Sequence, residues 1–122
     1  MSIQKISIAD KLGLFKDHWK PRVIGELNGQ HVKVAKALGE FDWHKHDHED
    51  EMFLVIKGEF NMELRDKTLV VRAGEMIIIP KGVEHRPVAN DEVEFMLFEP
   101  ASTLNTGDQP HSDLTQNNLG WI

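Results

Sequence analysis

Short apolar runs alternate with turn residues through the middle of the chain. The runs are rich in β-forming residues and occupy 52–57, 60–65, 69–72, 76–79 and 93–99. Glycine, proline, aspartate and asparagine stand between them, which is typical of tight connections between strands. No stretch long enough for a crossover helix separates the runs. The pattern therefore predicts an all-β barrel or sandwich rather than a parallel α/β fold.

Two of these runs differ in how their apolar residues are spaced. Residues 60–65 alternate strictly between apolar and polar, which predicts a strand with one face in the core. Residues 76–79 read Met-Ile-Ile-Ile and are apolar on both faces. We therefore expect the 76–79 strand to be covered on both sides.

The N-terminal region has helical spacing before the first strands. Over residues 7–19, apolar side chains recur at Ile8, Leu12, Phe15 and Trp19, and Ser7 with Asp10 has the spacing of a capping box. This predicts a short helix or turn.

A hairpin is expected directly after this segment. Two β-rich runs, 22–27 and 31–35, flank the dipeptide Asn28-Gly29. Asn-Gly readily adopts the two positive φ angles of a type I′ turn. The first two strands should therefore be antiparallel neighbours.

Beyond residue 100 the composition becomes polar, with Trp121 and Ile122 as the last apolar residues. We divide the chain into an N-terminal segment (1–19), a barrel (20–100) and a polar tail (101–122). The tail has two possible placements: across the barrel mouth or against a neighbouring subunit.

Composition narrows the classes of partner and chemistry. Fourteen basic and twenty acidic residues give a formal charge of −6, which disfavours nucleic acid and anionic membranes as partners. No cysteine is present, so histidine and carboxylate must supply any site chemistry. Without an apolar leader or a run of about 18 apolar residues, we expect a cytoplasmic protein.

Three histidines stand within five residues, and three acidic residues follow them. On an extended chain His44 and His46 point to the same side, because side chains alternate. A carboxylate from the next strand and a histidine from a distant strand would complete a set of three nitrogens and one oxygen for a divalent ion. The segment 80–85 supplies such a histidine, since proline and glycine there reverse the chain before His85.

These residues resemble the cupin family. Its first motif, HxH, four residues, Glu, six residues, Gly, is matched by His44, His46, Glu51 and Gly58. Its second, Gly, five residues, PxGxxH, is matched by Gly74, Pro80, Gly82 and His85.

The resemblance implies a fold and a metal site. The fold is a cupin double-stranded β-helix, a jelly-roll barrel. The metal ligands implied are His44, His46, Glu51 and His85, around one divalent ion of Fe, Mn, Ni, Zn or Cu, with further positions open to water or substrate.

Nearby residues compete for the same roles. Glu49 is the rival carboxylate, but only Glu51 lies seven residues before Gly58, and His48 is expected to turn outward. We also expect Lys45 and Arg86 to point away from the pocket. The remaining histidines should lie at the surface: His18, His31 and His111. The large apolar residues should pack in the core rather than line a substrate site: Trp43, Phe53, Met62, Phe95 and Phe98.

Fold and metal alone leave the function open. The first hypothesis is a metal-dependent enzyme acting on a small polar molecule, such as a sugar derivative or an organic acid, by isomerase or dioxygenase chemistry. The alternatives are a non-catalytic cupin that binds or senses a small molecule, and a metal-free structural cupin. The sequence identifies no general acid or base. Exposed strand edges predict a homodimer.

Overall fold

The computed structural model describes residues 2–122. Its one helix in that range, α1 (Ile8–Leu12), begins after Ser7, whose hydroxyl accepts a hydrogen bond from the Asp10 amide at 3.2 Å. The predicted short helix is confirmed, and it ends before Gly13. No helix in this range is long and apolar enough to cross a membrane.

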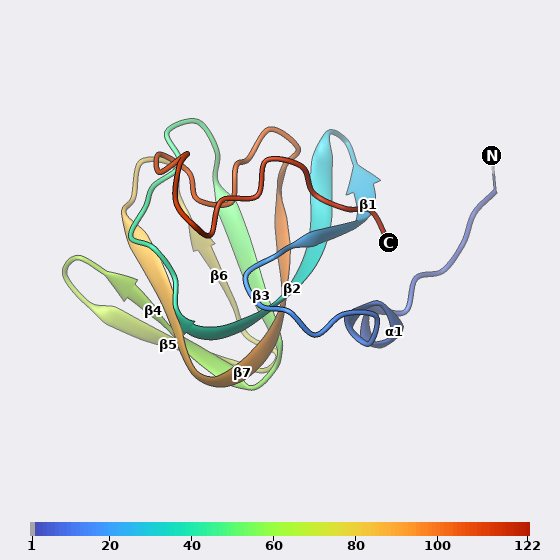
Figure 1. Cartoon of the computed structure of the whole chain (residues 1–122), viewed down its shortest axis with the longest axis horizontal. Coiled ribbons are helices and arrows are strands. Elements are labelled where there is room, and N and C mark those ends of the chain that lie inside the picture. Colours follow the sequence, from blue (N-terminus) through green and yellow to red (C-terminus); the bar gives the residue numbers. More distant parts are fainter. Residues whose placement is uncertain (1) are drawn as a thin grey trace.

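Seven strands follow and form one antiparallel sheet that curves on itself (Figure 1). They are β1 (Arg22–Leu27), β2 (Gln30–Glu40), β3 (Glu51–Lys57), β4 (Glu59–Leu64), β5 (Thr68–Arg72), β6 (Met76–Ile79) and β7 (His85–Pro100). The predicted hairpin joins β1 to β2, with φ of 52° at Asn28 and 78° at Gly29. The all-β prediction is confirmed.

Strand β7 connects the two halves of the barrel. The strand order is β1-β2-β7-β3-β6, and β4 joins this path by pairing with the first residues of β7 while its other edge pairs with β5. Figure 1 shows β7 as a bent ribbon, with β4 beside one part and β3 beside the other. The bend allows one strand to bring its first residue, His85, and its last residues to the same interior.

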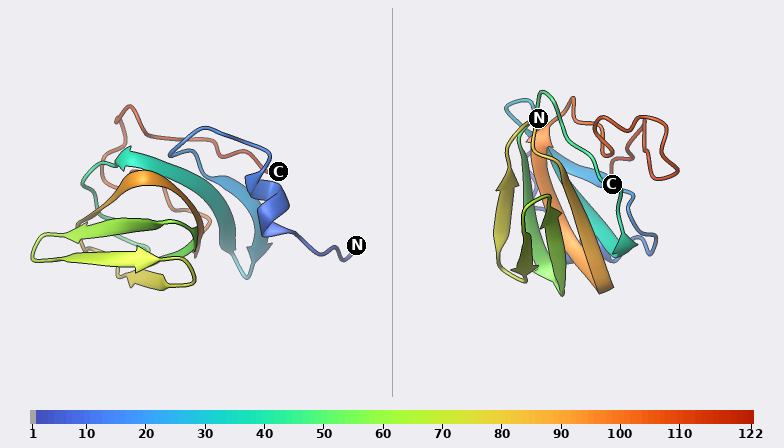
Figure 2. Two further views of the ribbon diagram at one scale, coloured as in Figure 1. Left: turned by 90° about the horizontal axis from the view of Figure 1, so that it is seen from below. Right: turned by 90° about the vertical axis from the view of Figure 1, so that its left-hand side faces the viewer.

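Apolar side chains pack on both sides of β2. Inside the barrel, Phe53, Phe60 and Phe95 form the centre of a large cluster that includes the predicted core residue Met62. Outside, Leu12 of α1 packs with Phe15, Ile24 and Val34. Helix α1 therefore covers the outer face of β2 and leaves the interior to the site (Figure 2).

The prediction that residues 76–79 are covered on both faces is wrong. Met76 is 59% exposed and Ile78 is 54% exposed, whereas Ile79 is buried. Strand β6 pairs only with β3 and lies at the edge of the sheet. An apolar run on both faces is typical of a central strand, but here the outward side chains have no covering layer among residues 2–122.

The C-terminal segment 101–122 packs on the barrel as an irregular strap, red in Figure 1. Thr103, Asn105 and Thr106 are buried. The end of the chain runs along β1, where the Val23 amide donates to the Gly120 carbonyl at 2.8 Å and the Ile122 amide donates to the Val23 carbonyl at 3.1 Å. The tail therefore covers one edge of the sheet and part of the barrel mouth.

Candidate metal centre

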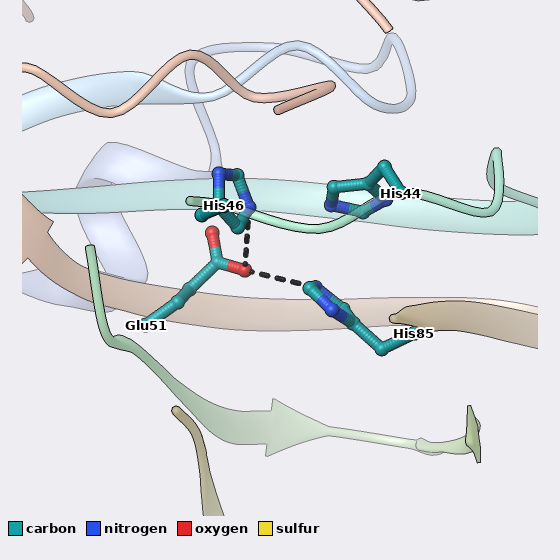
Figure 3. A group of neighbouring side chains, drawn as sticks. All are labelled: His44, His46, Glu51 and His85. Carbon is teal, nitrogen blue, oxygen red and sulfur yellow. Dashed lines mark hydrogen bonds and ion pairs between the residues drawn. The ribbon is translucent and has the colours of Figure 1, made fainter. Parts of the chain in front are cut away.

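Three chain segments bring the four predicted ligands to one place (Figure 3). His44 and His46 lie in an extended loop after β2, whereas Glu51 begins β3 and His85 begins β7. The backbones of His44 and His85 exchange two hydrogen bonds, of 3.1 and 2.9 Å. The loop is thereby fixed beside β7 although it belongs to no regular strand.

The side chains meet in a buried cluster. One potential ligand atom from each of the four residues lies within 4.8 Å of all the others. The Nε2 atoms of His46 and His85 are each 3.2 Å from Oε1 of Glu51. None of the four side chains is more than 4% exposed. Such a set of nitrogens and oxygen matches the donors of a borderline divalent ion.

The second ring nitrogen of two histidines is held by a backbone carbonyl. Nδ1 of His44 donates to the Asp42 carbonyl at 2.8 Å, and Nδ1 of His85 donates to the Val83 carbonyl at 2.9 Å. In the neutral tautomers this puts the proton on Nδ1 and the lone pair on Nε2 of both rings, which is the arrangement of metal-binding histidines.

His46 has neither of its ring nitrogens satisfied. Nδ1 and Nε2 are both buried without a hydrogen-bond partner in residues 2–122. The 3.2 Å approach of Nε2 to Glu51 therefore lacks hydrogen-bonding geometry. A buried unpaired nitrogen costs about 1–3 kcal/mol, and a bound cation would remove that cost. The residues present thus fit a metal ion.

Burial and charge shift the pKa values of the cluster. Burial lowers the pKa of His44 to about 4, and repulsion from His85 acts in the same direction. Burial would also lower the pKa of His46, but the Glu51 carboxylate beside it raises that pKa overall. Burial would raise the pKa of Glu51, yet the neighbouring side chains of Glu99, His46 and His85 hold it well below the usual range. Glu51 is therefore ionised and His44 neutral near pH 7.

Sequence reasoning missed two charged residues beside Glu51. Glu99 and Lys33 are each 1% exposed, and Lys33 Nζ donates to Glu99 Oε1 at 2.9 Å. Burial and the negative charge of Glu51 raise the pKa of Glu99 well above its ordinary value. The Oε2 atom of Glu99 is buried without a hydrogen-bond partner in residues 2–122. Alternation along 93–99 sets Glu99 on the same face as the core residue Phe95, and that signal could have found it.

A small cavity lies against the cluster on the inner side of the barrel. Its volume is about 30 Å³, and aromatic and aliphatic side chains with His44, Glu51 and Asn105 line it. The Asn105 amide is already occupied by the Leu114 carbonyl and the Gln116 amide, both at 2.9 Å. Since one water needs roughly 10–15 Å³ on this measure, the cavity holds only solvent-sized molecules.

A second hollow reaches the cluster from outside. Its volume is about 180 Å³, and it lies between the 46–49 loop and the strap, with His46 in its wall. Asp47, Glu49 and Asp108 also line it. Three carboxylates in its wall would attract a cation to the surface beside His46.

The competing residues lie elsewhere. Glu49 accepts a hydrogen bond from the Ser102 hydroxyl at 2.9 Å, and His48 is exposed. Arg86 binds Glu63 at 2.6 Å on the outside of the barrel. Trp43 is half-buried under the guanidinium of Arg65, and Phe98 is half-buried, so neither lines the cavity.

The described histidines outside the cluster do not all lie fully at the surface. His111 is exposed, and His18 pairs with Glu92 at 2.7 Å. His31 is half-buried, contacts the edge of the Trp121 ring, and has a buried Nδ1. The surface prediction is therefore wrong in part, because the end of the tail covers His31.

Comparison with known proteins agrees with this fold. The family model described as "Cupin domain" matches residues 30–99. The chain belongs to the cupin family. The predicted cupin barrel with a short N-terminal helix is therefore confirmed, and the matched range contains all four clustered residues.

Individual proteins resemble the chain over different lengths. A cupin-2 domain-containing protein of Shewanella frigidimarina is 47% identical with a TM-score of 0.77, over 78% of this chain and 93% of that one. Protein NMB1881 of Neisseria meningitidis is 28% identical with a TM-score of 0.73, over 80% and 100%. The uncharacterized protein YdbB of Bacillus subtilis is 44% identical over 64 residues, which are 52% of this chain and 57% of YdbB. The match thus spans little more than half of that curated relative.

Proposed function

We propose that this cupin binds one divalent metal ion through His44, His46, Glu51 and His85. The observation that carries the proposal is the convergence of four buried ligand atoms within 4.8 Å of one another. The carbonyl partners of His44 and His85, which occupy Nδ1 of each ring and so leave Nε2 as the ligand atom, support it. Fe, Mn, Ni, Zn and Cu all suit this donor set.

The function we propose is a metal-dependent reaction on a small polar molecule. A metal ion held here would supply Lewis-acid or redox chemistry to a molecule in the adjoining cavity. The protein's own contribution is a dry, apolar wall that excludes bulk water, and an ionised Glu51 that fixes the local charge. Because the cavity is only about 30 Å³, a sugar derivative or organic acid requires the strap 101–122 to move.

Metal content and a matched pair of variants test the site. The purified protein is expected to contain about one equivalent of a first-row metal by mass spectrometry, or to bind one in calorimetric titrations with Fe(II), Mn(II), Ni(II), Cu(II) and Zn(II). Glu51→Gln should lose that binding and Glu49→Gln should keep it. No binding by the wild-type protein in any titration would refute the proposal and favour the metal-free structural cupin.

A non-catalytic binding or sensing cupin is the second candidate function. It is favoured by the cavity wall, where the polar side chains are His44, Glu51 and the already bonded Asn105. No free acid or base stands there to move a proton. A metal-loaded protein whose thermal stability rises with a small ligand that is not consumed would favour binding. Oxygen uptake or isomerase turnover would favour the enzyme.

We also propose that two copies pair through the edge strand β6. The β1 edge is covered by residues 120–122, whereas β6 has no second partner strand in the described chain and exposes Met76 and Ile78. A second copy of the same strand would satisfy both the open edge and the apolar side chains. Light scattering should give a dimer for wild type and a monomer for Met76→Lys/Ile78→Lys; unchanged mass would contradict the pairing. Cytoplasmic location stays a prediction.

A further inference from the structure

The C-terminal strap contacts the candidate metal centre from outside the matched cupin range. The ligand loop, residues 41–50, lies between β2 and β3 and carries His44 and His46. It falls within the family match at residues 30–99, whereas the strap 101–122 does not. Residues from the loop and from the strap together line the hollow of about 180 Å³. Any effect of the strap on the loop is therefore a property of this chain beyond the matched domain.

Two separate segments hold the backbone of the ligand loop around its histidines. The backbones of His44 and His46 bond to the segment 82–85, at distances of 2.8–3.1 Å. Lys45, which stands between them, bonds instead to Asp108 of the strap. Its carbonyl accepts from the Asp108 amide at 3.0 Å, and its amide donates to Asp108 Oδ1 at 3.1 Å. One strap residue thus occupies both backbone polar groups of Lys45.

The peptide groups of Lys45 control how the two histidines lie relative to each other. His44 and His46 reach one point only while the chain between them is extended, because side chains two residues apart then share a side. The loop is not part of a regular strand, so no ladder of neighbouring bonds fixes that extension. The bonds to 82–85 engage the residues on either side of Lys45 and not Lys45 itself. Asp108 supplies the missing restraint.

Gly107 lets the strap come close enough to do this. Its φ is 54°, and a Cβ there would overlap the Lys45 carbonyl and lie 3.1 Å from Cδ2 of the His44 ring. Only a residue without a side chain fits that approach. The strap therefore lies against a ligand ring as well as against the backbone of the ligand loop.

We propose that Asp108 is a positioning residue that holds the Lys45 backbone so that His44 and His46 face the same metal ion. This inference rests on the proposed metal site. Asp108 is exposed and is not among the four clustered residues, so it acts through the ligand loop and not as a ligand. Outer partners of metal sites typically change affinity by about 10–100-fold, and a partner one residue removed from the ligands should lie near the lower end of that range.

Three variants separate the hydrogen bond of Asp108 from its charge. Asp108→Ala removes both, whereas Asp108→Asn removes the charge and keeps an oxygen for the Lys45 amide. Asp113→Ala removes another exposed carboxylate of the strap and leaves the Lys45 bonds in place. Zn(II) affinity should fall about 10-fold in Asp108→Ala. It should stay within about 3-fold of wild type in the other two variants, as expected for loss of an exposed charge.

Two spectroscopic measurements complete the test. The visible absorption of the Co(II)-loaded protein reports the ligand geometry and should change in Asp108→Ala alone. In metal-free protein the Lys45 amide should exchange its hydrogen faster in Asp108→Ala and at the wild-type rate in Asp108→Asn. Because Asp108 is exposed, all three variants should fold, and urea unfolding checks this.

The outcomes distinguish this inference from the proposed function. Wild-type Zn(II) affinity and an unchanged Co(II) spectrum in Asp108→Ala would overturn the positioning role while leaving the metal site in place. An equal loss of affinity in Asp108→Asn would also overturn it, because charge and not the hydrogen bond would then be responsible. Failure of the wild-type protein to bind metal would overturn the proposed function itself.

Discussion

The inner faces of three neighbouring strands begin with charged residues and end with apolar ones. At one end stand Lys33 of β2, Glu99 of β7 and Glu51 of β3. Four residues away from these, toward the other end of each strand, stand Ala37, Phe95 and Val55. All six are buried to a similar extent, with at most 3% exposed. The two ends of the barrel interior therefore differ in chemistry and not in access to water.

The apolar end stabilises the fold, whereas the polar end is available for chemistry. Burying apolar surface contributes about 25 cal/mol per Å², whereas burying charged and polar groups costs free energy unless each is paired. The apolar end, where Phe53, Phe60 and Phe95 pack together, offsets the cost of the polar end. Substitutions at the two ends should consequently affect different measurements.

The largest effect on stability is expected at the apolar end. Phe60→Ala removes a ring that is 1% exposed and lies 5.7 Å from Phe95, centroid to centroid. The free energy of unfolding in urea should fall by about 3–5 kcal/mol, because the cavity left behind cannot be refilled. The matched control Leu14→Ala, at a 67% exposed position, should change it by less than about 0.5 kcal/mol. Equal losses in the two variants would contradict the comparison.

A smaller effect, dependent on pH, is expected at the polar end. The pKa of His44 is about 4 in the folded protein against 6.5 as the ordinary value, so the unfolded state binds more protons between these pH values. This contribution is fully present above pH 6.5 and is lost as the pH falls through about 4. For metal-free protein it amounts to at most about 3 kcal/mol.

The variant His44→Gln isolates that contribution. Because glutamine does not titrate, its unfolding free energy should decline less between pH 6.5 and 4 than that of wild type. Urea unfolding at several pH values measures the difference. Parallel curves for the two proteins would show that His44 does not carry the acid sensitivity of the polar end.

The smallest expected effect concerns the strap over the polar end. Gly107 has a φ of 54°, and a Cβ there would overlap the Lys45 carbonyl of the ligand loop. Gly107→Ala should lower the free energy of unfolding by about 1–3 kcal/mol. Hydrogen exchange should quicken at the Asp108 amide, which donates to the Lys45 carbonyl at 3.0 Å, and at the Lys45 amide, which donates to Asp108 Oδ1 at 3.1 Å.

Gly74→Ala is the matched control for Gly107→Ala. Gly74 also has a positive φ, 83°, but a Cβ there would meet no atom within 4 Å. Its cost should be limited to backbone strain, with no change in exchange at Lys45. Identical behaviour of the two variants would show that the strap does not hold the ligand loop.

Local sequence information determined the strands, the first hairpin and the choice of carboxylate in the site. Alternation and turn residues predicted the strands, and Asn28-Gly29 predicted the first hairpin, because both depend on interactions between near neighbours in the chain. Motif spacing chose Glu51 over Glu49, and the structure brings Glu51 and not Glu49 to the three histidines.

Only the tertiary structure decided the remaining features, because these features depend on which distant segments become neighbours. Apolar spacing could not show that β6 is an edge strand, since a residue pattern describes faces and not the number of flanking strands. The pairing of Lys33 with Glu99 requires the register of β2 against β7, which no local pattern encodes. The interior therefore acquired its polar end from residues that, in the sequence alone, look like ordinary surface charges.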